Sequence, residues 1–178
     1  MRICVYGGGS TKIKPSYVDE AYKLGVEIGS RGHSLVFGGG VNGVMGAVSR
    51  GVASQGGEIL GIAPSWISSK EPLSPNCTDF IYTDTMDQRK NLFLKHSDCI
   101  IVAPGGLGTL DEFFEILTLK ALGQYDNKII LFNTNKFYSM FRQSLVYFSE
   151  EGFIKTDIMK LFTSMEDPKE ILDFIEEE

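Results

Sequence analysis

Three glycine-rich segments, each directly after a short apolar run, constrain the fold of this chain more than any other feature of its sequence. They are residues 7–10, 38–43 and 103–109. The apolar runs before them are rich in β-branched and aromatic residues, which favour strands. At the carboxyl ends of parallel strands such loops bring the backbone close to a ligand, and a following helix favours an anion. The sequence therefore predicts an α/β fold with a ligand site at one edge of its sheet.

Apolar runs and helical patterns alternate along the whole chain. The predicted strands are residues 3–6, 34–37, 59–63, 80–83, 99–102 and 128–132. The predicted helices begin at Pro15, after Gly43, at Thr85, at Thr109, near Lys136 and at Pro168. With right-handed crossovers, this alternation predicts a doubly wound parallel sheet flanked by helices, in a single domain over residues 1–178. The irregular segment 64–76 is interpreted as either a lid or a surface connection.

Composition and charge exclude several classes of partner. The chain has 178 residues, and 17 Lys and Arg stand against 23 Asp and Glu, giving a net charge of −6. A negative chain argues against a nucleic-acid partner, and the apolar runs are too short to span a membrane. Cys4, Cys77 and Cys99 form no CxxC pair, which predicts reduced thiols and a cytoplasmic location. His33 and His96 lie far apart in sequence, so we expect no metal site.

The glycine spacing also bears on the type of ligand. Gly38, Gly40 and Gly43 fit GxGxxG, but a dinucleotide site also needs an acidic residue at the end of the next strand. That strand ends at Ala63-Pro64, and the P-loop pattern GxxxxGK[ST] is absent as well. A mononucleotide or phosphosugar fits these loops better, and we expect no bound cofactor.

The segment after the third glycine loop carries the residues suited to chemistry. Thr109 and Glu112 have the spacing of a capping box, with Thr109 as the N-cap of a helix. Alternatively, Glu112 faces a ligand that is held by Gly105, Gly106 and Gly108. A carboxylate beside an anion site would stabilise a developing positive charge, such as an oxocarbenium-like sugar.

A second charged segment lies in the helix that Thr85 opens. Arg89 and Lys90 either clamp a phosphate, pair with Glu112, or form a solvated pair on a helix face. Trp66, in the irregular segment, either stacks on a ligand base or covers the core.

These segments resemble the motifs of one enzyme family. Residues 104–112, PGGLGTLDE, match the pattern PGGxGTxxE of the LOG ("Lonely Guy") family of cytokinin riboside 5′-monophosphate phosphoribohydrolases. Residues 86–90, MDQRK, match the family's MxxRK, and residues 37–46, FGGGVNGVMG, are similar to its YGGGxxGLMG. The resemblance extends over residues 1 to about 155.

The resemblance implies a Rossmann-like fold and a specific reaction. The reaction is hydrolysis of the N-glycosidic bond of a purine nucleoside 5′-monophosphate, of cytokinin type or AMP, which releases the free base and ribose 5-phosphate. It implies Arg89 and Glu112 as the catalytic pair, no cofactor, and a homodimer with the site near the partner subunit. The residues that it implies for substrate and phosphate binding are Gly8, Ser10, Gly39, Gly40, Met86, Lys90, Gly105, Gly106, Gly108 and Thr109.

Two departures from the family pattern bear on the site: the first removes a hydroxyl from the loop after the first strand, and the second leaves the base preference open. Residues 7–10 read GGGS where the family often has CGSS, and residues 118–128 lack the Trp and His of the family's TWxQLGxHxKP. Some relatives carry the label lysine decarboxylase, but the sequence offers no pyridoxal phosphate site. The alternative function is a non-catalytic binder of a phosphorylated ligand, such as a molybdenum-cofactor carrier or a nucleotide sensor. Arg89 together with Glu112 favours the enzyme, because a carrier has no use for a paired acid.

Overall fold

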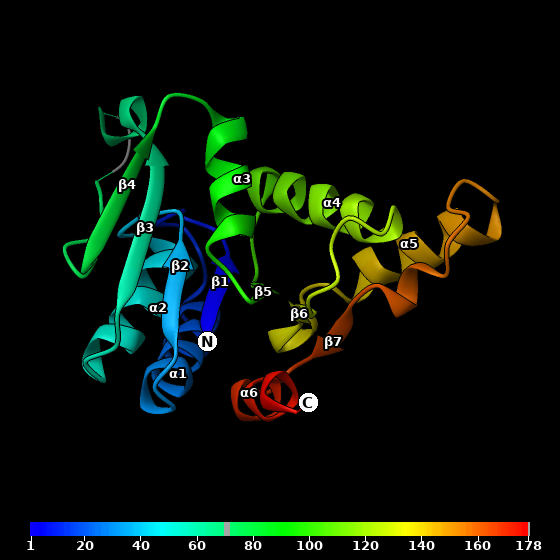
Figure 1. Ribbon diagram of the computed structural model, residues 1–178. Coiled ribbons are helices and arrows are strands. Elements are labelled where there is room, and N and C mark those ends of the chain that lie inside the picture. Colours follow the sequence, from blue (N-terminus) through cyan, green and yellow to red (C-terminus); the bar gives the residue numbers. More distant parts are fainter. Residues whose placement is uncertain (70–71, 178) are drawn as a thin grey trace.

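A seven-stranded parallel sheet forms the centre of the molecule, shown in Figure 1. The computed structural model describes residues 1–69 and 72–177. The strand order is β4-β3-β2-β1-β5-β6-β7, and every pairing between neighbours is parallel. The chain builds the sheet outward from β1 to β4 and then returns to the other side of β1. The strands are β1 Arg2–Tyr6, β2 Ser34–Phe37, β3 Ile59–Pro64, β4 Asp79–Thr83, β5 Cys99–Val102, β6 Ile129–Phe132 and β7 Thr163–Met165.

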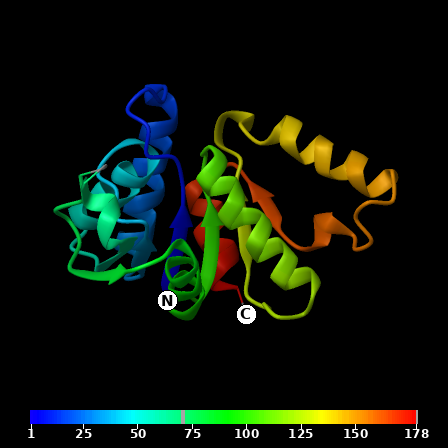
Figure 2. The same ribbon diagram turned by 90° about the horizontal axis from the view of Figure 1, so that it is seen from above.

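Helices cover both faces of the sheet, as Figure 2 shows from above. Buried side chains of α1, α2 and α6 pack on one face, and those of α3, α4 and α5 pack on the other. Strand residues alternate between the two layers, so that Ile3 and Val5 join the first layer and Cys4 and Tyr6 the second. The helices are α1 Pro15–Ser30, α2 Gly43–Ser54, α3 Met86–Lys95, α4 Leu107–Ala121, α5 Ser139–Glu150 and α6 Pro168–Glu176, with 3₁₀ turns η1 Ser65–Ser69, η2 Thr134–Lys136 and η3 Ile158–Lys160.

The doubly wound parallel sheet and its six expected strands are confirmed. A seventh strand, Thr163–Met165, was not predicted, because it is three residues long and only partly buried. Thr85 is the N-cap of α3, as expected: its hydroxyl accepts a hydrogen bond from the Gln88 N–H at 3.2 Å. The expected helix near Lys136 begins three residues later, because Asn135 and Lys136 have positive φ angles of 52° and 58°.

The predicted capping box at Thr109 is wrong. Helix α4 begins at Leu107 with Gly106 as its N-cap, so Glu112 lies in the second turn rather than the first. The Thr109 side chain packs instead on the Gly105 backbone, where an added Cβ would lie 2.1 Å from its hydroxyl oxygen.

Two helices that begin at the carboxyl edge of the sheet, α1 and α2, touch through their backbones. A Cβ added to Gly25 would lie 2.2 Å from the Val48 carbonyl oxygen, and one on Gly51 would lie 2.3 Å from the Tyr22 carbonyl oxygen. Glycine at both positions therefore allows a contact that no side chain permits. This contact fixes the two helices as one wall beside the glycine loops that follow β1 and β2.

Part of the segment 64–76 forms regular secondary structure. Strand β3 extends to Pro64, η1 follows, and residues 70 and 71 lie outside the described part of the chain. Trp66 is 45% exposed, and its indole N–H donates to the Asp84 carbonyl, which joins η1 to the segment before α3. Among the described helices, none is long and apolar enough to cross a membrane.

Candidate active site

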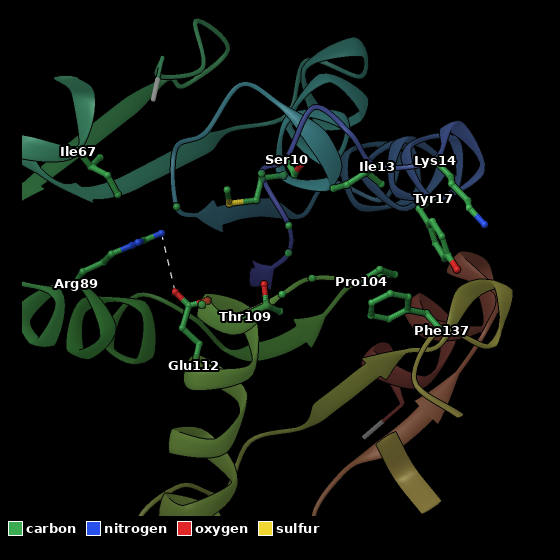
Figure 3. A pocket seen from close by; sticks show the side chains of 18 of the residues that line it. Ser10, Ile13, Lys14, Tyr17, Ile67, Arg89, Pro104, Thr109, Glu112 and Phe137 are labelled. Atoms are coloured by element: carbon green, nitrogen blue, oxygen red, sulfur yellow. Dashed lines mark ion pairs between the residues drawn. The ribbon is translucent and has the colours of Figure 1, made fainter. Parts of the chain in front are cut away.

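A cavity of about 670 Å³ opens at the carboxyl ends of β1, β2 and β5, where the sequence predicted a ligand site. The loop after β1, the loop after β5 and the first turns of α4 form one side of it, and Arg89 of α3 forms another (Figure 3). The Gly8 N–H donates to the Pro104 carbonyl at 3.0 Å, so the first and third glycine loops are joined directly. Because the strand order reverses beside β1, this is the place where doubly wound folds bind ligands.

The middle of the cavity is suited to an anion. Gly106, the N-cap of α4, and Gly108, in its first turn, have open space where a side chain would be, so their backbone faces the cavity. The first N–H groups of a helix lack partners within it, and the helix dipole adds positive potential there. Thr109 adds a buried hydroxyl at the same point. A phosphate group matches this set of donors.

One wall of the cavity holds a buried arginine–carboxylate pair, drawn in Figure 3. Nη2 of Arg89 lies 4.0 Å from Oε1 of Glu112, and each side chain is 10% exposed. The guanidinium lies over the Phe93 ring, with Cζ 5.1 Å from its centroid, and Nη1 lies 3.8 Å from the Met86 sulfur. Nε of Arg89 is buried and has no hydrogen-bond partner among residues 1–69 and 72–177. The guanidinium is therefore held in place, but not all of its N–H groups have hydrogen-bond partners.

Burial makes Glu112 a group that titrates near neutrality. Loss of water around the carboxyl raises its pKa to about 7, and the positive charge of Arg89 opposes this rise. The neighbouring carboxylate of Asp111 raises the pKa further. A carboxyl with a pKa close to the working pH can hold or release a proton during a reaction.

Glycine at position 38 makes room for the arginine. A Cβ on Gly38 would lie 2.1 Å from Nη2 of Arg89. The guanidinium of Arg89 therefore occupies the space beside Gly38, the first glycine of the second glycine loop.

Most residues that the sequence predicted for the site line the cavity. They are Gly8, Ser10, Met86, Arg89, Gly105, Gly106, Gly108, Thr109 and Glu112. Three others lie elsewhere. Gly39 faces the Phe80 ring and accepts a hydrogen bond from the Ser74 N–H, and Gly40 pairs with Leu73. Lys90 is turned toward carboxylates of α4 because it follows Arg89 by one position, about 100° around the helix.

The far end of the cavity is lined by aromatic and aliphatic side chains together with Lys14, and this part of the site was not predicted. Tyr17 of α1 and Phe137, just after η2, meet there edge to face with their ring centroids 5.5 Å apart. Ile13 and Lys14 precede α1 and line the same end, as Figure 3 shows. Tyr17 has the helical spacing of a core residue, so its sequence position carries no signal of a ligand. Ile67, next to Trp66, also lines the cavity.

The described part of the chain contains no group of three or more His, Cys, Asp or Glu side chains that could hold a metal ion. Arg89, Glu112, the hydroxyl of Thr109 and the backbone donors at the start of α4 are the groups that this site offers for chemistry.

Comparison with known proteins identifies the family. Residues 45–175 match the family described as "possible lysine decarboxylase". The cytokinin riboside 5′-monophosphate phosphoribohydrolase LOG3 of Arabidopsis thaliana is 38% identical over 176 residues, which cover 99% of this chain and 82% of the plant protein. The chain belongs to the LOG family. The corresponding enzyme LOG of Oryza sativa is 35% identical over 99% of this chain and 73% of its own length.

Solved structures agree with the family's fold. The molybdenum cofactor binding protein of Rippkaea orientalis matches with a TM-score of 0.76 and 26% identity, over 98% of this chain and 94% of that protein. The molybdenum cofactor carrier protein of Chlamydomonas reinhardtii matches with a TM-score of 0.73 and 23% identity over the same shares. The second likeness concerns the fold alone.

Proposed function

We propose that this member of the LOG family hydrolyses the N-glycosidic bond of a purine nucleoside 5′-monophosphate, releasing the free base and ribose 5-phosphate. The observation that carries the proposal is the Arg89–Glu112 pair beside the start of α4, inside one cavity. Its relatives of 34–38% identity are named as enzymes that act on cytokinin riboside 5′-monophosphates. Cytokinin-type nucleotides and AMP are the two substrates to compare.

The geometry supports a mechanism in which the phosphate fixes the sugar. The 5′-phosphate binds the N–H groups at the start of α4 and the hydroxyl of Thr109, with Gly8, Ser10 and Gly105 completing the cradle. Binding there places the ribose toward Glu112. The carbon–nitrogen bond breaks as its electron pair leaves with the base, and the ionised carboxylate stabilises the positive charge that develops on the sugar.

Water completes the reaction. Glu112 accepts a proton from a water molecule whose oxygen bonds to the sugar carbon, the departing base takes up a proton from solvent, and Glu112 returns its own proton to solvent. Arg89 holds the carboxylate in place through its charge, and its guanidinium lines the cavity that receives the substrate. A neutral Glu112 cannot take the proton, so the ionised form is the active one.

We also propose a single domain over residues 1–178 that forms a homodimer in the cytoplasm. The site lies on one continuous sheet, which supports the proposal of a single domain.

The outer faces of α4 and α5 expose large apolar side chains. Such side chains support the proposal of a homodimer, in which a second subunit would cover them. Leu122, Phe114, Met140, Tyr147 and the nearby Phe153 are between 43% and 84% exposed. Cys4, Cys77 and Cys99 are free thiols, consistent with a reducing compartment.

Product analysis tests the proposed reaction. Purified protein is incubated separately with AMP and with N6-isopentenyladenosine monophosphate, and the products are separated by chromatography. We expect free base and ribose 5-phosphate in equal amounts from at least one substrate, and Glu112→Gln to lose most of the activity. The absence of product from both substrates with a folded protein would refute the proposal.

A carrier function is the second candidate, because one of the matching structures at 26% identity is a molybdenum cofactor binding protein. A carrier would bind a phosphorylated pterin without breaking it. A coloured pterin that copurifies with the protein, together with no release of base from either nucleotide, would favour the carrier.

A further inference from the structure

Lys90 is not part of the cavity lining but shares a neighbouring crevice with the proposed catalytic carboxyl of Glu112. Its Nζ lies 2.5 Å from Oε2 of Glu115 and 3.4 Å from Oδ2 of Asp111. Lys90, Glu112 and Glu115 also line one narrow crevice with Tyr6. The Lys90 side chain is only 17% exposed, whereas Glu115 is 32% and Asp111 62% exposed, so the contact to Glu115 is the better shielded of the two. They join α3, which carries Arg89, to α4, which carries Glu112.

Helix α4 needs such a cation at this point. Asp111 and Glu115 are four residues apart, and like charges at this spacing destabilise a helix. Glu112 lies between them, with Glu115 three residues on, so three carboxyl groups share two turns of one helix. Lys90 binds the two outer carboxylates. The hydrogen bond to Glu115 raises the pKa of Lys90, so the lysine stays charged.

Every charge near Glu112 affects its ionisation. From α3, Arg89 and Lys90 favour the ionised form, and from α4, Asp111 and Glu115 oppose it. Cys4 and Tyr6 of β1 also interact with the Glu112 charge, but burial raises the pKa of both, so they stay neutral. The lysine is thus a positive charge that acts on Glu112 directly and also neutralises its two acidic neighbours.

We propose that Lys90 is a positioning residue for the reaction: it holds Asp111 and Glu115 in an ion-pair cluster and so keeps Glu112 available as a carboxylate at neutral pH. This inference rests on the proposed function, and it gives Lys90 a role different from the substrate contact that the sequence predicted. Loss of Lys90 leaves the cavity lining unchanged and affects the proton affinity of Glu112.

The test is the pH dependence of kcat/KM in Lys90→Met. Removing the lysine charge raises the pKa of Glu112, since the cation is lost and two carboxylates lose their partner. We expect the acidic limb of the profile to move upward by about one pH unit. At pH 7 this lowers kcat/KM about fivefold, and the loss disappears near pH 9, where Glu112 is ionised again. Measured where Glu112 is ionised, KM stays as in the wild type.

Three further variants separate this role from a general loss of structure. Lys90→Arg keeps the charge and is expected to restore the wild-type profile. Lys95→Met makes the same change in the last turn of α3, at an exposed position, and is expected to leave the profile unchanged. Glu115→Gln removes one acidic neighbour and is expected to move the limb to lower pH. If Lys90→Met does not fold, Glu115→Gln still tests the charge balance.

A measurement that needs no activity keeps this inference distinct from the proposed reaction. The midpoint of Glu112 ionisation is followed by NMR of ¹³C-labelled glutamate carboxyls, with Glu112→Gln to assign the signal. We expect Lys90→Met to raise this midpoint even if neither nucleotide is hydrolysed. An unchanged midpoint, or a loss of activity that is equal at every pH, would overturn the role of Lys90.

Discussion

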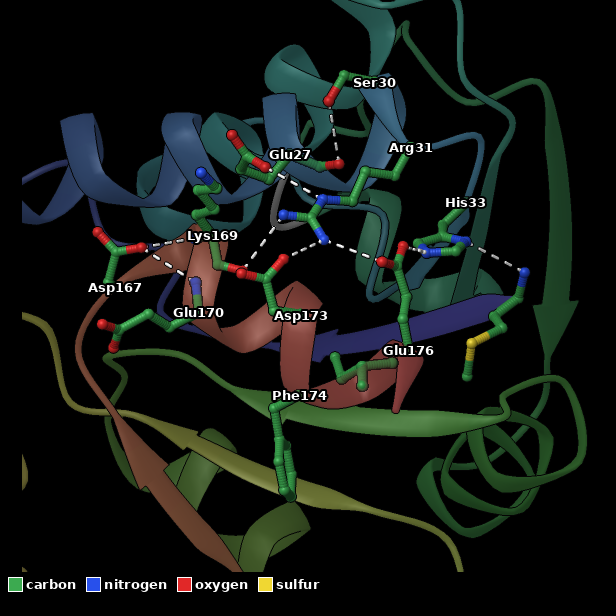
Figure 4. Close-up of polar contacts among 12 residues, drawn as sticks. Glu27, Ser30, Arg31, His33, Asp167, Lys169, Glu170, Asp173, Phe174 and Glu176 are labelled. Carbon is green, nitrogen blue, oxygen red and sulfur yellow. Dashed lines mark hydrogen bonds and ion pairs between the residues drawn. The ribbon is translucent and has the colours of Figure 1, made fainter. Parts of the chain in front are cut away.

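Two arginines lie at opposite edges of the sheet, and their surroundings differ sharply. Arg31 ends α1 at the amino edge of the strands and holds α6 against the domain, as Figure 4 shows. Its Nη1 donates to Asp173 at 2.7 Å and to Glu176 at 3.0 Å, and its Nε donates to Glu27 at 3.3 Å. His33 adds a further contact to Glu176 at 2.8 Å.

Arg89, at the carboxyl edge, is more deeply buried and has fewer partners. A single carboxylate lies 4.0 Å away, and its Nε lacks a partner within the described chain. Buried donors without partners are costly, and Nε of Arg142, on α5, is a second one in the described chain. The two arginines thus differ in how far the chain fills their donors: Arg31 binds side chains of α1 and α6, whereas Arg89 contacts one carboxylate and lines the cavity.

Arg89→Met gives the largest expected effect. The side chain keeps its apolar contacts but loses the charge that lies 4.0 Å from Glu112 and lines the cavity. We expect kcat/KM to fall by about 100-fold or more, about 3 kcal/mol of transition-state binding. The fold survives, because Glu112 can take up a proton when the guanidinium is gone. Chromatographic rates and thermal melts measure the two effects, and a wild-type rate would remove Arg89 from the mechanism.

Glu112→Gln tests the other member of the pair through stability. The carboxyl has a pKa of about 7 when folded and about 4.5 when unfolded. Between these values the folded state binds more protons than the unfolded state, so stability falls as pH rises. Glutamine does not ionise, so its unfolding free energy does not fall in this way. The difference in unfolding free energy between Glu112→Gln and wild type should therefore shift by on the order of 3 kcal/mol in favour of the variant from pH 4.5 to pH 8. Urea unfolding at both pH values measures it, and parallel curves for the two proteins would contradict it.

Gly38→Ala reduces the space available to the Arg89 guanidinium and leaves its charge unchanged. The added methyl group meets the end of a flexible side chain, so the guanidinium moves and the backbone does not. We expect about a tenfold lower kcat/KM with a nearly unchanged melting temperature. Gly106→Ala, where a Cβ meets open space, is the matched control for stability. A large drop in melting temperature for Gly38→Ala, but not for Gly106→Ala, would show that the backbone shifts instead of the Arg89 side chain.

Arg31→Met gives the smallest effect and the opposite pattern. Its ion pairs are partly exposed, so their loss should cost only about 1 kcal/mol of unfolding free energy. We expect kcat/KM to stay at the wild-type value, because α6 lies far from the cavity edge. Urea unfolding and the same rate assay check both statements, and a slower reaction would show that the two edges of the sheet are coupled.

The architecture was predictable from local patterns, and the exceptions have local causes. Runs such as Cys99–Val102 are apolar at every position, which marks a central parallel strand. The strand Thr163–Met165 carries no such pattern, since it lies at the edge and is half-buried. The start of α4 was misplaced, because Thr109 has the spacing of a capping residue, whereas a glycine three residues earlier takes that place.

The site was predictable where a motif lies in one segment, and less so where distant segments meet. Gly105, Gly108 and Glu112 follow one another along the chain, so their grouping could be read directly. Tyr17 and Phe137 are 120 residues apart and meet only in the folded protein. Lys90 shares the MxxRK pattern with Arg89, but adjacent residues on a helix point in different directions. Only the fold shows that Arg89 lines the cavity and Lys90 does not.

The close crossing of α1 and α2 has a consequence for reading mutational data. Gly25 and Gly51 carry no functional group and lie deep in the contact between two helices. A single methyl group at either position would separate helices whose first residues frame the cavity. In a genetic screen scored by activity, such substitutions would rank with those of catalytic residues. Measuring the amount of folded protein for each variant would distinguish damage to this joint from damage to the chemistry.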